Sequence, residues 1–593
     1  MYGWNGKILH INLTCLDFHV ETPGMDFYKK FIGGKGMGGY YLRQCATLPY
    51  DHPDMGIALF TGPLVATIAP TSGRAHLVSK SPLTGLVGDA SVGGKLATQL
   101  KRAGWDGMVI TGKSPYPIGI EISNDQVKFC RCDHLWGQDT RKVYEILFQN
   151  KPNLKKASLA CIGQAGENGV SFASITVDQH HTAGRTGLGR SFGVKHLKYI
   201  QVQGQGHTIV KDAKGLKKAR EEIIRLTAAS PALMGQYGFT HLGTGAVYDL
   251  MANRRMMPTD NFRATRFEPA AALNAAAYSK RYAPRKHGCR GCHILCKKIG
   301  TKGNLPFTMP EFETMSHFTA LIGCQDTDLV LEANDRCNRY GMDTISAAVT
   351  LATRREITGQ NFTAASLLAL LDDMALNQGE GKQLNKGALA YATALGRPET
   401  AMTVKGMELP AYDPRGAYGM ALGYALSTRG GCHLRAYPIS HEIFRKPVAT
   451  DRFSFSGKAR IIKIAEDTNA VVDSLTACKF IIFAAGLEEY AKAYTAVTGV
   501  ESSAQDLMSI GERIYYNERI INCLNGFDAK NDDLPQRFFN EPGTSGNQIQ
   551  IPPIDREEFM NARKKYYDIR GLDPCGNPLK SKTLELGLQW TNL

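Results

Sequence analysis

The sequence lacks the segments that would direct the chain into a membrane or out of the cell. The opening residues, MYGWNGKILH, contain neither the apolar stretch nor the small-residue cleavage site of a signal peptide. The longest apolar stretch, residues 471–487, contains Asp473 and Lys479 and is too short to span a bilayer. We therefore expect a cytoplasmic protein without a membrane span.

Basic residues do not cluster, although they outnumber acidic ones. Lys and Arg total 70 against 55 for Asp and Glu, which gives a net charge of +15. The charge is dispersed and no nucleic-acid recognition module accompanies it, so we expect no nucleic-acid partner. A dispersed positive charge suits an anionic cofactor or an acidic protein partner instead.

Internal repeats and low-complexity linkers are also missing, and the length indicates several packed domains. The 593 residues exceed the roughly 250–300 at which a single hydrophobic core stops growing. Short β-rich runs bounded by Gly, Pro, Asn and Asp dominate the first part of the chain. The expected strands are residues 7–14, 56–61, 75–79, 107–111, 118–123, 127–131, 158–162, 172–177 and 199–202.

Helical periodicity replaces this pattern after about residue 208. The expected helices are residues 212–228, 329–340, 346–355, 364–377, 456–478, 486–498 and 504–524. We therefore predict an α+β protein. A β-rich base domain, residues 1–208, precedes two helical domains, residues 209–409 and 410–593.

The fourteen cysteines are scattered except for one tight group, Cys289, Cys292 and Cys296. Their C-x2-C-x3-C spacing lets three thiolates face one iron–sulfur cluster, which needs a fourth ligand from elsewhere. One alternative is a zinc site completed by His287 or His293, disfavoured by the missing second C-x2-C pair; the other is a set of reduced structural thiols. Spacing alone does not choose the fourth cluster ligand among Cys324, Cys337, Cys432 and Cys478.

Glycine is abundant, at 61 residues, and several glycine-bearing stretches have the form of anion-binding loops. Residues 34–39 match the dinucleotide pattern G-x-G-x-x-G, but a helix-like segment precedes them and no βαβ alternation follows. We expect a structural turn or a loop beside another phosphate ligand there. Residues 72–74, 90–94 and 180–187 combine glycines with cations or small residues, and together they favour an anionic cofactor in the β domain.

Glu313 and His433 are polar residues that lie in short Pro- or Gly-containing motifs. Glu313 follows Pro310 at an expected helix start, where an acid is favoured in any case. His433 ends the run Gly430-Gly-Cys432-His433, and a lone histidine more often has a structural role. Their own sequence context therefore does not make either residue catalytic.

Six sequence blocks in order resemble the tungsten-containing aldehyde:ferredoxin oxidoreductase family over nearly the whole chain. The blocks are Trp4-Asn-Gly-Lys-Ile-Leu-His-Ile-Asn-Leu, Lys80-Ser-Pro-Leu-Thr-Gly85, Gly163-Gln-Ala-Gly-Glu-Asn168, the cysteine group, residues 409–416 and residues 430–433. The resemblance implies a β-rich base domain and two helical domains that enclose a buried metallopterin.

The resemblance also implies a set of cofactor ligands. Cys289, Cys292 and Cys296 would share a [4Fe–4S] cluster with Cys478, which ends Asp473-Ser-Leu-Thr-Ala-Cys478 where the family has Asp-x-x-Gly-Leu-Cys. The sister motif, Asp-x-x-Gly-Leu-Asp in the family, is Asn338-Arg-Tyr-Gly-Met-Asp343 here. The implied pterin contacts are Arg74, Ser91, Gly93, His181, Thr182, Gly184, Arg185, Asn338, Met342, Asp343, Arg435, Asp473 and Lys479.

Glu313 and His433 match the polar pair beside the metal in that family, so the resemblance gives both a catalytic role. The implied cofactors are a tungsten or molybdenum bis-pterin, one [4Fe–4S] cluster and a Mg²⁺ ion that bridges the pterin phosphates. The implied reaction oxidises an aldehyde to a carboxylic acid, reversibly in principle, and passes electrons to an acidic ferredoxin or a ferredoxin-like subunit.

Other hypotheses stay open at this point. A related metallopterin enzyme on another substrate, such as an aromatic acyl-CoA reductase catalytic subunit, is the first alternative. A non-catalytic iron–sulfur electron-transfer subunit is a second alternative, and a zinc-stapled RNA-binding protein is the least favoured. The sequence leaves open the metal, the substrate and the oligomeric state, a homodimer included.

Overall fold

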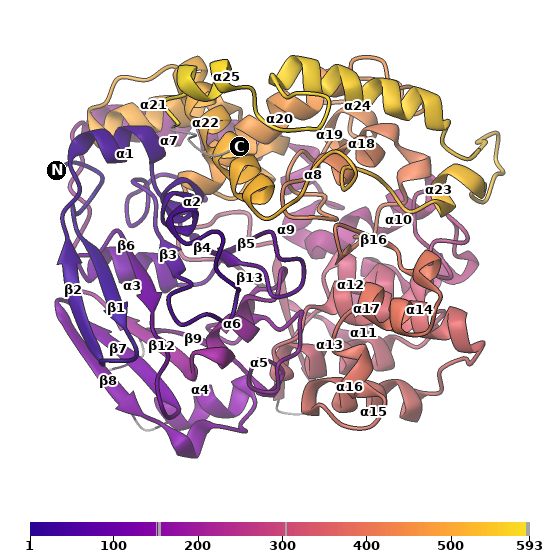
Figure 1. Cartoon of the computed structure of the whole chain (residues 1–593), viewed down its shortest axis with the longest axis horizontal. Coiled ribbons are helices and arrows are strands. Elements are labelled where there is room, and N and C mark those ends of the chain that lie inside the picture. The colour runs from indigo at the N-terminus through magenta and orange to yellow at the C-terminus, as the bar shows by residue number, and fades with distance from the viewer. Residues whose placement is uncertain (150, 152–153, 155, 303–304, 589–593) are drawn as a thin grey trace.

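The structure, a computed structural model, describes residues 1–149, 151, 154, 156–302 and 305–588. Its N-terminal part contains two six-stranded sheets (Figure 1). The first sheet has the order β2-β1-β6-β3-β4-β5 and consists of β1 (Ile8–Asn12), β2 (Asp17–Glu21), β3 (Ile57–Phe60), β4 (Ala75–Lys80), β5 (Val87–Val92) and β6 (Gly107–Thr111). The second has the order β11-β10-β9-β12-β7-β8 and consists of β7 (Ile118–Ser123), β8 (Gln126–Arg131), β9 (Ser158–Cys161), β10 (Ile175–Val177), β11 (His181–Ala183) and β12 (Leu197–Gln203).

The two sheets share one hydrophobic core. Leu9 and Ile11 stand two residues apart in β1 and so project from the same face, and they join Ile120 of β7 and Ile200 of β12 in this core. All the expected strands are present, β6 and β7 with the predicted ends and the others with shifted ends, and β7 and β8 form an antiparallel hairpin. The sequence analysis did not identify β2, a five-residue strand most of whose residues are exposed.

The glycine-rich run at residues 34–39 corrects an expectation. It begins helix α2 (Gly34–Gln44) and is neither a turn nor a phosphate loop. A Cβ at Gly34 would clash with the carbonyl oxygen of Asp473, and one at Gly38 would lie 2.5 Å from Val78 Cγ2. The glycines therefore let α2 pack closely against β4 and against the end of a C-terminal helix.

The expected helices are all present, because each has an apolar stripe at helical spacing. They are α7 (Ala213–Ala228), α13 (Thr327–Tyr340), α14 (Thr344–Thr358), α15 (Ala364–Leu376), α20 (Lys458–Ser474), α21 (Leu487–Thr498) and α22 (Ala504–Leu524). Helix α20 ends at Ser474 rather than at residue 478, since Thr476 adopts a left-handed φ of 53°. Cys478 therefore lies in a loop.

Several elements escape the sequence pattern. Helix α18 (Tyr418–Leu426) is buried along its whole length and so shows no polar face. A small sheet, β13-β14-β15 (Arg285–His287, Lys297–Lys302 and Leu305–Thr308), interrupts the helical part and carries the cysteine group between its first two strands.

Segments far apart in the sequence pack together. Figure 1 shows α21 and α7 beside α1 (Met25–Phe31). Trp4 packs against Tyr494 of α21 with ring centroids 6.0 Å apart, and its indole Nε1 donates to the carbonyl oxygen of Ile32 at 2.7 Å. The predicted mixed α+β fold is confirmed. The boundary near residue 409 stays a prediction, and residues on both sides of it, such as Leu351 and Tyr424, join one core.

No helix within the described part of the chain combines the length and apolar character needed to cross a membrane.

Candidate functional site

A cavity of about 330 Å³ lies where the β-rich part meets the helical part. Its walls include ends of β4, β5 and β11, the helix α12 (Phe312–Ser316) and the loop that follows α20. The expected cofactor contacts that line it are Arg74, Ser91, Gly93, His181, Thr182, Gly184, Arg185, Arg435, Asp473 and Lys479. The lining also includes Glu313, His433, Cys289, Cys296 and Cys478.

Three expected cofactor contacts lie outside this wall. Asn338 lines a separate small hollow, and its carbonyl oxygen accepts from Thr140 Oγ1 at 3.1 Å. Met342 is buried in the hydrophobic core. Asp343 caps α14 and accepts a hydrogen bond from Arg185 Nε at 3.2 Å, so it reaches the cavity only through Arg185.

Arg185 faces the cavity, but its guanidinium is engaged by the protein. Besides the bond to Asp343, Nη1 donates to the carbonyl oxygen of Gly431 at 2.7 Å and Nη2 to that of Glu408 at 2.5 Å. The bond to Gly431 holds the backbone just before His433, and the bond to Glu408 holds the segment that leads to Ala411. Arg185 therefore fixes the position of that segment and adds positive charge to the cavity.

The cysteine group lies at the edge of the cavity. Cys289, Cys292 and Cys296 occupy the connection between β13 and β14, and a Cβ at Gly93 would clash with the sulfur of Cys289. The loop after α20 places Cys478 close to these cysteines. Cys292 and Cys289 are near enough to influence the pKa of the Cys478 thiol. Burial raises the pKa of Cys478 to about 11.

The other candidates for a fourth cluster ligand have different surroundings. Cys337 is fully buried in the core of the helical part. Cys324 Sγ contacts the backbone of Asp326. Cys432 Sγ accepts a hydrogen bond from Arg429 Nη2 at 2.9 Å. Cys478 is thus the one that lies with the C-x2-C-x3-C group.

The spacing of the sulfur atoms bears on the choice between zinc and a cluster. Four thiolates on one tetrahedral zinc ion would stand about 3.8 Å apart, given Zn–S bonds of about 2.3 Å. Among the described residues, one group of three or more His, Cys, Asp or Glu has its ligand atoms within 4.8 Å of one another, and it contains no cysteine. No three of the described cysteine sulfur atoms therefore lie within 4.8 Å of one another, a wider spacing than four thiolates on one zinc ion require.

Arg74 connects the cysteine group to the cavity. Its Nε donates to Ser91 Oγ at 2.7 Å and its Nη2 to the Ser91 carbonyl oxygen at 2.8 Å. Burial alone would lower the pKa of Arg74, but the charges of Cys478, Cys289 and Cys296 raise it. Arg74 can therefore neutralise negative charge both on the cysteine group and on a ligand in the cavity.

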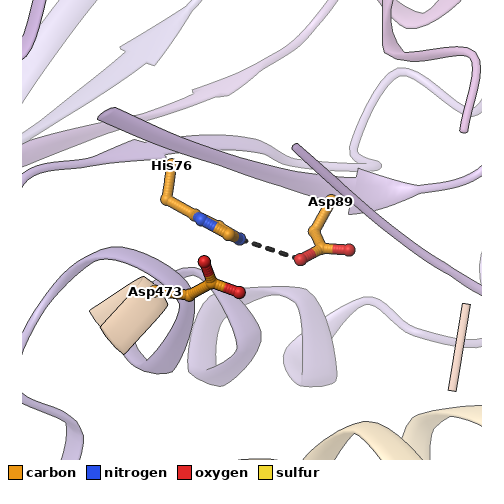
Figure 2. A group of neighbouring side chains, drawn as sticks. All are labelled: His76, Asp89 and Asp473. Carbon is orange, nitrogen blue, oxygen red and sulfur yellow. Dashed lines mark hydrogen bonds and ion pairs between the residues drawn. The ribbon is translucent and has the colours of Figure 1, made fainter. Parts of the chain in front are cut away.

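A buried network around Asp89 forms another part of the wall, and the sequence patterns did not identify it. Figure 2 shows His76, Asp89 and Asp473 facing one another, with His76 Nε2 2.9 Å from Asp89 Oδ2. Arg435 binds both carboxylate oxygens of Asp89, at 2.8 and 3.0 Å.

Cations compensate the two carboxylates of this network. Burial alone would raise the pKa of Asp89, but Arg435, Arg429 and Lys35 hold it well below its usual range. Asp473 pairs with Lys479 at 2.7 Å. The surrounding cations make the network a charge-balanced scaffold for a ligand rather than a site for a metal ion.

Glu313 and His433 come together although 120 residues separate them in the sequence. Glu313 Oε1 lies 3.4 Å from His433 Nε2, and Glu313 Oε2 accepts from the Ala411 backbone N–H at 2.7 Å. Burial raises the pKa of Glu313 to about 8 and lowers the pKa of His433 well below its usual range. At neutral pH the carboxyl is therefore mostly protonated and the imidazole neutral.

Unpaired polar atoms show that the cavity is built for a polar ligand. Buried atoms without a hydrogen-bond partner among the described residues include Glu313 Oε1, His433 Nδ1, His76 Nδ1 and Asp473 Oδ1. All four belong to residues of the cavity wall. Buried polar atoms normally have partners, so these four fit a bound group with several donors and acceptors.

Family models cover most of the chain. The model described as "Aldehyde ferredoxin oxidoreductase, N-terminal domain" matches residues 8–204, and "Aldehyde ferredoxin oxidoreductase, domains 2 & 3" matches residues 218–588.

Curated relatives extend over the full length. The tungsten-containing aldehyde ferredoxin oxidoreductase of Thermococcus kodakarensis is 34% identical, with 99% of each chain covered. That of Pyrococcus furiosus is 33% identical, with the same coverage. The WOR-like subunit of an aliphatic sulfonate oxidoreductase from Pyrococcus furiosus is 27% identical, with 99% of this chain and 97% of the relative covered.

A solved structure shares the fold. The active-site complex BamBC of benzoyl coenzyme A reductase, bound to 1,5-dienoyl-CoA, superposes with a TM-score of 0.84. The match covers 99% of this chain and 97% of that one. Because the identity is 21%, the match supports a shared architecture and nothing more.

Proposed function

The chain belongs to the aldehyde ferredoxin oxidoreductase family, and on that premise we propose that it oxidises aldehydes to carboxylic acids. Each turnover would convert one aldehyde and one water into one carboxylic acid, two protons and two electrons. Ferredoxin or a ferredoxin-like subunit would accept the electrons. The observation that carries the proposal is the convergence of Glu313, His433, a cationic wall and the cysteine group on one cavity.

A tungsten or molybdenum bis-pterin bound in this cavity would supply the two-electron chemistry. Arg74, Arg435 and Lys479 would offer positive charge to its phosphates, and the loops at Ser91 and Gly184 would lie beside these phosphates and their Mg²⁺ ion.

Asp473 and His76 suit the polar edge of a pterin ring. Asp473 Oδ1 is a buried acceptor with no partner among the described residues. His76 Nε2 lies 2.9 Å from Asp89 Oδ2, and His76 Nδ1 is a second buried atom with no partner among the described residues. Asp473 Oδ1 can receive an N–H group of a pterin, and His76 Nδ1 offers a second polar contact.

The catalytic roles follow from the protonation states of the pair. We assign neutral His433 the donation of a hydrogen bond to the aldehyde oxygen, where negative charge develops during attack by water. Glu313 accepts the proton of that water once its carboxyl is ionised. Since burial sets the pKa of Glu313 to about 8, the ionised fraction grows as the pH rises through that value.

Cys289, Cys292, Cys296 and Cys478 would hold the [4Fe–4S] cluster through which electrons leave. Arg74 lies between these cysteines and the cavity, so its charge would stabilise the reduced cluster and the cofactor phosphates together.

Elemental analysis tests the proposal most directly. Protein purified from a host that supplies both metals should contain tungsten or molybdenum together with about four iron atoms per chain. Iron alone would support a non-catalytic electron-transfer subunit instead. Zinc in place of iron would overturn the cluster assignment.

Ferredoxin reduction should depend on ionic strength. Arg285, Lys286 and Arg290 are exposed around the cysteine group, and the whole chain has a net charge of +15. Electrostatic steering of an acidic ferredoxin is screened over roughly 8–10 Å at physiological salt, so its second-order reduction rate should fall steeply as salt rises. Reduction of a small neutral dye is the control. Equal salt profiles for both acceptors would refute steering.

A further inference from the structure

The cavity wall carries two kinds of side chain. Its cations include Arg74, Arg429, Arg435 and Lys479. Its aromatic side chains include Phe239, Phe312, Tyr412, Tyr437, Phe480 and Phe483. His433 adjoins the aromatic set, because its ring contacts two tyrosines.

The aromatic side chains form a continuous series that starts at His433. The His433 ring centroid lies 5.5 Å from that of Tyr412 and 5.9 Å from that of Tyr437. Tyr437 lies 6.0 Å from Phe483, which lies 5.7 Å from Phe239. These separations fall in the range of about 4.5–7 Å at which aromatic rings attract one another.

The geometry within the series is mostly edge to face. The interplanar angle is 81° between Tyr437 and Phe483 and 88° between Phe239 and Phe483. The tyrosines beside His433 are also fixed, because the hydroxyl groups of Tyr412 and Tyr437 lie 3.0 Å apart in a hydrogen bond. A flat aromatic group would bury more apolar surface against this wall than a short aliphatic group and would add ring-to-ring contacts.

We propose that this aromatic part of the wall is the substrate-binding subsite and that it takes the ring of an aromatic aldehyde. The inference rests on the proposed function, which it extends by naming the substrate class. The ring would pack against Phe483 and Tyr437, and the carbonyl group would then point to His433 and Glu313. The reaction stays that of the proposed function: the aldehyde gains the oxygen of water, and aldehyde and water together release two protons and two electrons.

Paired substrates test the inference on the metal-loaded protein with a small dye as acceptor. We expect kcat/KM for benzaldehyde to exceed that for acetaldehyde on the order of 10²-fold, as apolar pockets discriminate by roughly 10–200-fold per missing group. The variant Phe483→Ala should reduce this ratio by about tenfold. Phe31→Ala is the matched control. Both phenylalanines are 7% exposed, but Phe31 lies in α1, outside the cavity wall. The benzaldehyde-to-acetaldehyde ratio of this variant should match that of the wild type.

Calorimetric titration gives a second measurement that needs no turnover. Benzoate should bind the oxidised holoenzyme at least about tenfold more tightly than acetate, and Phe483→Ala should remove most of that difference. If Phe483→Ala does not fold, Phe483→Leu keeps an apolar side chain and removes the ring. Equal kcat/KM values for the two aldehydes, or equal affinities for the two acids, would overturn the aromatic subsite and leave the proposed function intact. No oxidation of either aldehyde by metal-loaded protein would instead count against the proposed function.

Discussion

A Cys478→Ala variant is expected to lose the [4Fe–4S] signal from the electron paramagnetic resonance spectrum of the reduced protein. Three cysteines remain, and a cubane cluster needs four protein ligands or an exchangeable one that leaves it labile. Iron content should fall and ferredoxin reduction should become undetectable, since electrons would have no route out of the cavity. Metal analysis and spectroscopy on the same sample measure both effects.

Matched cysteine variants control for general damage. Cys324→Ala and Cys337→Ala should both keep the signal, since Cys324 contacts the Asp326 backbone and Cys337 lies in the helical core. Cys337 is fully buried, so its variant also shows what the loss of a core side chain does to cluster content. An unchanged cluster signal in the Cys478→Ala protein would remove Cys478 from the ligand set.

The fold was largely predictable because its signals are local. Helices such as α22 repeat an apolar stripe over many residues, and β7–β8 carries strand patterns on both sides of Asn124. Helix α18 could not be found in this way, since a helix buried on every side has no periodic contrast. The prediction for the glycines of α2 was wrong for a related reason. These glycines are needed because Val78 and Asp473, which are distant in the sequence, pack against the helix.

The candidate site was predictable only in part. The C-x2-C-x3-C group is contiguous, so its spacing alone indicates a shared ligand. The Asp89–Arg435 contact joins residues 346 positions apart, and no spacing rule links them. Asn338 and Met342 occupy positions of a family motif, with Asn for Asp and Met for Leu, but lie outside the cavity wall, because the sister loop reaches the site through Asp343 and Arg185. The family motifs therefore located the region of the site, whereas the fold shows which of the matched residues line the cavity.

A Glu313→Gln variant should turn over on the order of 10²–10⁴ times more slowly than the wild type, normalised to bound tungsten or molybdenum. Gln keeps the shape of the side chain and its contact with the Ala411 N–H but cannot accept the proton of the attacking water. Cofactor and iron contents should not change, because Glu313 Oε1 has no hydrogen-bond partner among the described residues that the substitution would break.

The pH profile separates a base from a structural carboxyl. With the pKa of Glu313 raised by burial to about 8, its ionised fraction grows about tenfold between pH 7 and pH 9. Wild-type kcat should follow this rise, while the residual activity of Glu313→Gln should not. His433→Asn should also lower the rate, because it alters the donor to the developing oxyanion, yet it should retain the rise with pH.

A purely structural role for Glu313 predicts a different result. If Glu313 served only to hold Ala411 and start α12, Glu313→Gln would lower stability or cofactor content and keep the turnover per bound metal. A normalised rate near that of the wild type, with the same rise between pH 7 and pH 9, would place the titrating base elsewhere. Among the described residues, His433 is the nearest titratable neighbour that Glu313 contacts, and burial already keeps it neutral across that range. The proton would then have to pass directly to solvent or to the cofactor, and the buried pair would be a scaffold rather than the acid–base machinery.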